Sequence, residues 1–184
     1  ASLSATATAA FAQPARPPAD TGFGAWADPN HDGPGGMKYE TFASKLADTD
    51  VSYLIYLPPG YETDKDQRYP VIYWLHGRGG SQTGAGNFAV RLDAAIKAGK
   101  APAAIVVGVN GRKTSSWVDT FDGKSPVQSV IIKELIPLVD STYRTKATRE
   151  GRAIEGFSMG GAGAPKIGFK HPELFGAVSV IAGA

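Results

Sequence analysis

The stretch from Arg152 to Gly161, which reads RAIEGFSMGG, places the strongest constraint on how this 184-residue chain folds. It begins as a short apolar strand, turns sharply at one serine and continues into small residues that open a helix. The segment 156–160 fits the G-x-S-x-G pattern, in which a tight strand-to-helix turn holds a serine hydroxyl clear of the sheet. Glycine suits both ends because the two backbones approach so closely that a Cβ would collide. The pattern predicts Ser158 as a nucleophile, and the alternative is a glycine-rich turn without chemistry.

Apolar runs and helical periodicities alternate through the rest of the chain. Two strands without an intervening helix come first, so an antiparallel start to the sheet is expected. Later strands are separated by helices, which favours a mostly parallel, doubly wound α/β sheet covered on both faces. The predicted strands are 37–43, 51–57, 69–75, 103–109, the elbow strand that leads into the Ser158 turn (the elbow), and 177–181. The first predicted helix contains Phe88, Leu92, Ala95 and Ile96 and is closed by Gly99. This is the element order of the α/β-hydrolase fold, cut short after the strand that follows the elbow helix.

A second helix is predicted after residue 125. Ser125 is the expected N-cap, Pro126 occupies the first helical position and Gln128 completes a capping box. An apolar stripe from Val127 to Val139 follows, and Pro137 is expected to bend the helix.

The N-terminal region differs in composition. Residues 1–12 are almost all small, and Ala10-Phe-Ala12 resembles the end of a secretory signal whose earlier part is missing. The alternative is a disordered, alanine-rich terminus. Residues 13–36 are rich in proline and glycine and are predicted as a linker or surface loop. We therefore expect a signal remnant and linker over 1–36, a catalytic domain over 37–184, and a secreted or periplasmic protein.

Composition excludes several classes of partner and chemistry. The net charge is +2 and no dense basic run is present, so neither nucleic acid nor an anionic membrane surface is an expected partner. No apolar run approaches the roughly 18 residues of a membrane span. The chain has no cysteine, which excludes disulfides, thiol catalysis and cysteine-ligated metals.

A serine nucleophile needs hydrogen-bond donors for the oxyanion that forms when it attacks a carbonyl carbon. One predicted donor is the backbone N–H of Met159, at the start of the elbow helix. The other is the amide of Arg78 in the loop 76–80, HGRGG, which follows a buried strand. A plain glycine-rich turn is the alternative interpretation of that loop.

The sequence offers no general base for Ser158. In this fold the acid and the histidine follow the serine, and only His171 does so, about 20 Å away along the predicted helix. His171 is interpreted as a helix C-cap, His76 as a residue that orders its loop, and His31 as part of the linker. Glu173 is no better placed than His171.

Several segments together resemble the esterase-D-like α/β hydrolases, which include secreted feruloyl and acetylxylan esterases. The segments are 76–80 (HGRGG), 107–110 (VGVN), 133–140 (KELIPLVD), 143–145 (YRT), 149–161 (REGRAIEGFSMGG) and 171–176 (HPELFG). The resemblance covers about residues 37–184. It implies a serine esterase that acts through an acyl-enzyme without metal or cofactor. It also implies that the Asp and His of the triad belong to a C-terminal third absent from these residues. Pro165 departs from the family pattern and is expected to kink the elbow helix.

The loop 76–80 and the possible export signal favour the branch that acts on carbohydrate esters. Trp117 and Phe121 are candidates for lining an acyl or sugar pocket, or else ordinary packing aromatics. A small-molecule or polysaccharide ester is the expected substrate, and the oligomeric state is not predicted. The alternatives are an acyltransferase, a siderophore esterase, or a non-catalytic protein if the chain ends at Ala184.

Overall fold

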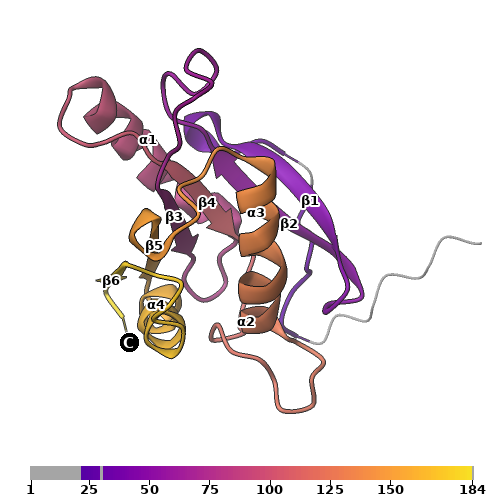
Figure 1. The fold of residues 1–184 in the computed structure, drawn as a ribbon. Helices are drawn as coiled ribbons and strands as arrows, with labels where there is room; N and C mark the ends of the chain where they lie inside the picture. Colours follow the sequence, from indigo (N-terminus) through magenta and orange to yellow (C-terminus); the bar gives the residue numbers. More distant parts are fainter. Residues whose placement is uncertain (1–21, 30, 184) are drawn as a thin grey trace, which may run out of the picture.

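A computed structural model of the chain describes residues 22–29 and 31–183. Within them lies a six-stranded sheet with the order β1-β2-β4-β3-β5-β6 and helices against both faces (Figure 1). The pairs β3–β4, β3–β5 and β5–β6 are parallel, whereas β1–β2 and β2–β4 are antiparallel. The strands are β1 (Lys38–Ser44), β2 (Thr49–Tyr56), β3 (Val71–Leu75), β4 (Ile105–Val109), β5 (Arg152–Phe157) and β6 (Ala177–Ile181). The predicted α/β class and the antiparallel start of the sheet are confirmed.

The helices follow the predicted order along the chain. They are α1 (Ala85–Lys97), α2 (Val127–Val130), a π-helical segment (Ile131–Leu135), α3 (Ile136–Thr142) and α4 (Met159–Lys170), with 3-10 turns at Pro34–Gly36, Gln82–Gly84 and Arg149–Gly151. Gly99 follows α1 with φ = 67°, as expected of a glycine that closes a helix. Pro165 lies inside α4, which remains helical on both sides of it.

The second helix is interrupted near Pro137 and lacks the predicted side-chain cap. The π-helical segment Ile131–Leu135 separates α2 from α3, and Pro137 is the second residue of α3. Proline has no N–H to donate, and a π segment is one way to change the hydrogen-bond register around it. The capping box is wrong: no side chain caps α2, and the Ser125 hydroxyl accepts a hydrogen bond from Arg112 Nη1 at 3.0 Å. The N-cap position is Pro126, one residue later than predicted, and the Ser125 hydroxyl serves the buried Arg112 guanidinium.

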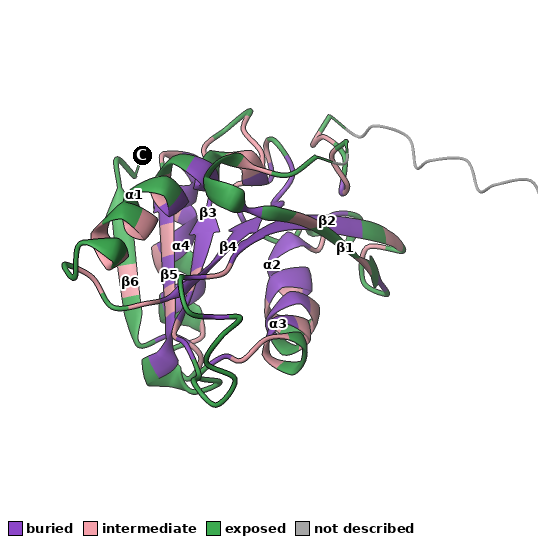
Figure 2. Ribbon diagram, turned by 90° about the horizontal axis from the view of Figure 1, so that it is seen from above, coloured by how far each residue is buried: buried purple, intermediate pink, exposed green. Residues whose placement is uncertain are grey.

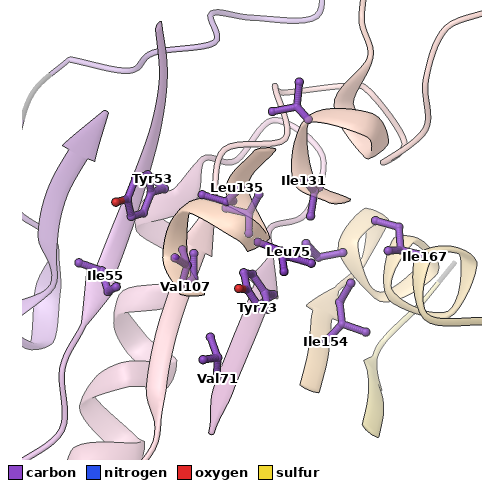
Figure 3. Close-up of a cluster of buried hydrophobic side chains, with 14 of the residues drawn as sticks. Tyr53, Ile55, Val71, Tyr73, Leu75, Val107, Ile131, Leu135, Ile154 and Ile167 are labelled. Atoms are coloured by element: carbon purple, nitrogen blue, oxygen red, sulfur yellow. The ribbon is translucent and has the colours of Figure 1, made fainter. Parts of the chain in front are cut away.

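Two clusters of buried side chains form the core, one on each face of the sheet. The larger cluster joins β3, β4 and β5 to the α2–α3 region and to α4, and Figure 3 shows Ile131, Leu135 and Ile167 directed toward the strands. The smaller cluster lies under α1 and includes Leu54, Trp74 and Val106. Short strands buried on both faces explain why their sequences are continuously apolar.

The segment that precedes β1 is packed against the domain, which corrects the linker prediction for its described part. Trp26 is only 6% exposed, and its carbonyl accepts hydrogen bonds from the Ser52 amide at 3.0 Å and from Asn110 Nδ2 at 2.7 Å. Arg112 donates through Nε to the Gly24 carbonyl at 2.8 Å and lies over the Phe23 and Trp26 rings. The predicted signal remnant over residues 1–12 lies outside the described residues.

Burial falls toward one edge of the sheet. β3 and β4 are largely buried, whereas β6 is mostly exposed along its length (Figure 2). Val180 and Ile181 on β6 are 52% and 42% exposed. No helix in the described ranges is long and apolar enough to cross a bilayer.

Candidate active site

Ser158 forms the turn between β5 and α4, as the sequence predicts. Its backbone lies at φ = 53° and ψ = −116°, a conformation that residues with a side chain rarely adopt. The Ser158 N–H donates to the Ile181 carbonyl at 2.9 Å, and the Ser158 carbonyl accepts from the Ala162 N–H at 2.9 Å. Both backbone groups of the serine are therefore fixed, one by β6 and one by α4, and these bonds support the strained conformation.

The glycines around Ser158 lie where backbones meet. A Cβ on Gly156 would overlap the Gly160 carbonyl, and a Cβ on Gly160 would overlap the Leu75 carbonyl at the end of β3. A Cβ on Gly161 would stand 2.6 Å from the Ile181 carbonyl oxygen. The predicted reason for glycine at both ends of the motif, close approach of strand and helix backbones, is confirmed.

A cavity of about 350 Å³ lies beside the serine. Its lining consists of Arg78, Ser116, Ser158, Met159, Ala162 and Lys166. The predicted nucleophile and both residues predicted to supply oxyanion donors therefore share one cavity. The loop that carries Arg78 lies against the serine, because a Cβ on Gly77 would be 3.4 Å from Ser158 Cβ.

The backbone amides of the loop after β3 differ in their hydrogen bonding. The Gly79 N–H donates to the Lys113 carbonyl at 2.7 Å, and the Gly80 N–H donates to the Gly77 carbonyl at 3.0 Å. Within residues 22–29 and 31–183, the amides of Arg78 and Met159 have no protein acceptor. The Met159 amide also stands at the N-terminus of the 12-residue helix α4, where the helix dipole favours negative charge. Both amides are thus free to donate to an oxyanion.

His76 supports the loop from the buried side. Its Nδ1 lies 2.8 Å from the Gly77 carbonyl, its Nε2 lies 3.4 Å from the Gly111 amide, and its own carbonyl accepts from the Trp117 indole N–H at 3.2 Å. Burial lowers the pKa of His76, which favours the neutral ring. A neutral ring with the proton on Nδ1 satisfies both ring contacts. His76 therefore orders the loop, as the sequence suggests.

No histidine of the chain lines the cavity beside Ser158. His171 caps the C-terminus of α4, where its N–H donates to the Ile167 carbonyl at 3.0 Å and its Nδ1 lies 3.4 Å from Glu173 Oε1. His31 lines a separate cleft, and its Nδ1 lies 2.6 Å from the Pro29 carbonyl. The described residues bring no general base to the serine. They also contain no group of three or more His, Cys, Asp or Glu side chains that could hold a metal ion.

The cleft that includes His31 is the larger of the two hollows, at about 960 Å³. Arg78 lines both the cleft and the smaller cavity, so the two adjoin at the loop after β3. Phe157 and Ile181, at the carboxyl ends of β5 and β6, line the cleft as well. This is the end of the parallel strands at which sites form in open α/β sheets.

A family model described as a putative esterase matches residues 44–184. The chain belongs to this esterase family. It is 34% identical over 165 residues to an endo-1,4-beta-xylanase/feruloyl esterase of Xylanibacter ruminicola, a match that covers 85% of this chain and 22% of the relative. It is 35% identical over 127 residues to esterase Rv1288 of Mycobacterium tuberculosis, covering 68% of this chain and 27% of that protein.

Solved structures agree with this assignment. A ferulic acid esterase superposes with a TM-score of 0.74 at 28% identity, covering 80% of this chain and 58% of that one. A ferulic acid esterase of Anaeromyces mucronatus, solved with ferulic acid, gives 0.68 at 27% identity, with coverage of 80% and 58%. An S-formylglutathione hydrolase of Agrobacterium tumefaciens, at 21% identity and a TM-score of 0.62, shares the α/β-hydrolase fold. The esterase-family chain thus spans less than two thirds of these relatives.

The two aromatic residues proposed for a substrate pocket do not lie beside Ser158 in this esterase-family structure. Trp117 is fully buried, with its ring edge-on to His76 at 4.9 Å between centroids, and a Cβ on Gly163 would meet that ring at 2.6 Å. Phe121 is fully exposed and lines a different hollow of about 480 Å³. Trp117 is therefore a packing residue beneath the loop after β3, and the described residues give Phe121 no contact with the Ser158 cavity.

Three cavity residues of this esterase-family chain were not singled out from the sequence. Ala162 and Lys166 follow Ser158 at intervals of four and eight residues, so helical spacing alone places them on the face of α4 below the serine. Ser116 lies on the loop after β4 with φ = 55°, and no sequence pattern indicates its position.

Proposed function

We propose that the protein is a serine carboxylic-ester hydrolase with Ser158 as its nucleophile. The observation that carries the proposal is the Ser158 turn, which shares a cavity with two unpaired amides. Ser158 Oγ attacks the ester carbonyl carbon, and the Arg78 and Met159 amides donate to the resulting oxyanion. The alcohol then leaves, and water hydrolyses the acyl-serine to release the acid.

The Ser158 proton requires a base, which we propose is a histidine, oriented by an aspartate, from residues beyond position 184. The support is twofold. None of His31, His76 and His171 lines the serine cavity, and the chain covers only 58% of the ferulic acid esterase with which it superposes. In the order typical of this fold, the acid and the histidine follow the serine.

We propose feruloyl or acetyl esters of plant polysaccharide as substrates. The support is the 34% identity to a protein described as a xylanase and feruloyl esterase, and the similarity to a ferulic acid esterase solved with ferulic acid. An extracellular or periplasmic location suits a polymeric substrate, and the small-residue segment ending at Ala12 supports export. No metal or cofactor is required by this chemistry.

The test compares methyl ferulate and acetylated xylan hydrolysis by the full-length protein and by two serine variants. Ser158→Ala is expected to lower kcat by at least about 10³-fold, because the nucleophile is lost. Ser116→Ala is the matched control, since its hydroxyl lines the same cavity but lies outside the elbow, and it should keep activity within a few-fold.

A fluorophosphonate probe adds a readout that does not depend on the choice of ester. The probe should phosphonylate one serine, with loss of fluoride, in the wild type and in Ser116→Ala, and none in Ser158→Ala. Equal ester hydrolysis by Ser158→Ala and the wild type would refute the proposed role of this serine.

A further inference from the structure

The direction of the Arg78 N–H is set by hydrogen bonds on the two peptide planes next to it. The Arg78 N–H shares a plane with the Gly77 carbonyl and points the opposite way, because the peptide unit is trans. The Gly77 carbonyl lies 2.8 Å from His76 Nδ1. The following plane is held by the Gly79 N–H, which donates to the Lys113 carbonyl at 2.7 Å. His76 and Lys113 therefore control how the Arg78 amide is presented.

Both of these supports come from the loop after β4, on either side of Arg112. The Gly111 N–H donates to His76 Nε2 at 3.4 Å and so fixes the ring that contacts the loop after β3. Lys113, on the other side of Arg112, supplies the carbonyl that accepts from Gly79. A shift of the backbone at Arg112 would move both supports at once.

Arg112 itself has an unfavourable backbone conformation that its surroundings maintain. Its φ is 59°, in the left-handed region, and the residue is only 5% exposed. Its N–H donates to Asn110 Oδ1 at 3.0 Å, and its Nη1 donates to the Ser125 hydroxyl at 3.0 Å. Its Nε donates to the Gly24 carbonyl at 2.8 Å. The guanidinium thus ties the loop after β4 to two other segments of the chain.

One of those segments, residues 23–26, precedes the sheet and runs beside the loop after β4. The Phe23 carbonyl accepts from the Lys113 N–H at 2.5 Å, next to the contact between Gly24 and Arg112. The guanidinium carbon of Arg112 lies 5.3 Å from the centroid of the Phe23 ring and 5.2 Å from that of Trp26. The segment therefore holds Arg112 and Lys113, and through Lys113 it reaches the loop after β3.

We infer that Arg112 is a positioning residue for ester hydrolysis: it holds the segment 23–26 against the loop after β4, and that loop fixes the direction of the Arg78 amide. The inference rests on the proposed function, in which the Arg78 amide donates to the oxyanion. An amide used only when the oxyanion forms affects kcat more than KM. Acylation and deacylation both form an oxyanion, so kcat reports the effect whichever step is slower.

The first experiment measures kcat and KM of the full-length protein on methyl ferulate, well below the melting temperature of each variant. Arg112→Met should lower kcat about 30-fold with KM within about twofold, since complete loss of an oxyanion donor costs about 10²–10³-fold. Arg112→Lys keeps the charge but has one donor group where the guanidinium uses two, so it should recover only part of kcat.

Arg144→Met is the matched control. The Arg144 guanidinium also lies over an aromatic ring, that of Tyr61 at 3.8 Å, and donates to the Tyr61 carbonyl. Arg144 lies at the other end of the sheet, where its carbonyl accepts from the Tyr69 N–H before β3. Its kcat should stay within about twofold of the wild-type value.

A second variant leaves Arg112 in place and removes its partners. A protein that begins at residue 25 lacks Phe23 and Gly24 but keeps Trp26, and it is compared with one that begins at residue 22. The shorter protein should show the same kind of change, a lower kcat with little change in KM. A kcat within about twofold of the wild type in both Arg112→Met and the shorter protein, or an equal decrease in Arg144→Met, would overturn the inference.

Hydrogen exchange adds a readout that does not depend on activity. The amides of residues 76–82 should exchange faster in Arg112→Met than in the wild type, because the Gly79 N–H loses its fixed acceptor, and should be unchanged in Arg144→Met. Unchanged exchange in Arg112→Met would also overturn the inference. Faster exchange in Arg112→Met, together with no ester hydrolysis by the wild type, would refute the esterase proposal and retain the support of the loop by Arg112.

Discussion

Ser158 is held in place by backbone atoms. Its amide and carbonyl are bonded to Ile181 and Ala162, and the neighbouring glycines allow β3, β5 and α4 to approach without side chains between them. The strained φ of 53° is stable only if all these contacts are present together. A single added carbon atom at this point should therefore have a large effect.

Gly160→Ala tests this directly. The new Cβ would overlap the Leu75 carbonyl, which belongs to the buried strand β3 and cannot move without disturbing the sheet. We expect a loss of about 3 kcal/mol or more in the free energy of unfolding, measured by urea denaturation of the full-length protein. Gly99→Ala is the matched control, because a Cβ there has open space and only the positive φ is unfavourable, at about 1 kcal/mol. Equal losses for the two variants would show that the close approach is not rigid.

At the scale of elements, the described residues from Phe23 to Pro34 behave as part of the domain although none of them lies in a strand. Trp26 fills the space beside β2, Arg112 donates to Gly24, and Pro34 contacts α1 at Gly86. Removing the segment would expose the core around Trp26 and leave Asn110 and Arg112 without these acceptors.

A pair of N-terminal deletions measures this contribution. The two proteins are truncated only at the N-terminus, one beginning at residue 37 and the other at residue 22. The shorter one should melt about 5–10 °C below the longer one, because burial of the tryptophan and its hydrogen bonds contribute about 3 kcal/mol. Trp26→Ala in the longer protein should reproduce a large part of the decrease. Identical melting temperatures for the two deletions would show that the segment is only a linker.

The sequence predicts the elements that have strong periodicity or a motif, and less of the loops between them. The central strands, α1 and the Ser158 turn follow from apolar runs, helical spacing and paired glycines. The packed segment around Trp26 escaped prediction because prolines and glycines mask one anchoring aromatic. The cap at Ser125 was mispredicted because its competitor, Arg112, is 13 residues away and buried. Trp117 was placed in a pocket because a sequence does not show which way a loop aromatic turns.

Across the whole molecule, the sheet is covered unevenly. The α2–α3 region and α4 cover one face, while α1 lies on the other, where Phe157 and Ile181 are 47% and 42% exposed.

Half-buried Glu155 lies between Trp74 and Ser179 in the sheet register, and desolvation raises the pKa of its carboxyl. Burial raises the pKa of Glu155 and lowers that of His76, so the two groups change the stability of the folded state in opposite directions as the pH changes.

His76 should make the folded state less stable in mild acid. Burial lowers the pKa of His76 in the folded protein, whereas the unfolded value is about 6.5. Its contribution is complete above pH 6.5 and decreases as the pH falls toward the folded pKa, because the unfolded state then binds the extra proton. Thermal melting at pH 7.5 and pH 5 should show a smaller decrease for His76→Asn than for the wild type.

His31→Asn serves as the control for this pH dependence, since it makes the same substitution at an exposed histidine outside the core. Glu155, whose pKa is raised by burial, acts with the opposite sign and is present in all three proteins, so its contribution cancels in the comparison. A His76→Asn variant with the wild-type pH dependence would contradict the assignment of His76 as a neutral buried ring.

The division between backbone and side chains at the elbow has a consequence for laboratory evolution. The contacts that fix Ser158 involve amides, carbonyls and glycines, whereas the walls of the adjoining cavity come from side chains of Arg78, Ser116 and Lys166. Saturation libraries at those three positions should yield many folded variants with altered preferences, while libraries at Gly156 and Gly160 should yield almost none. New selectivities can then be screened without rebuilding the Ser158 turn.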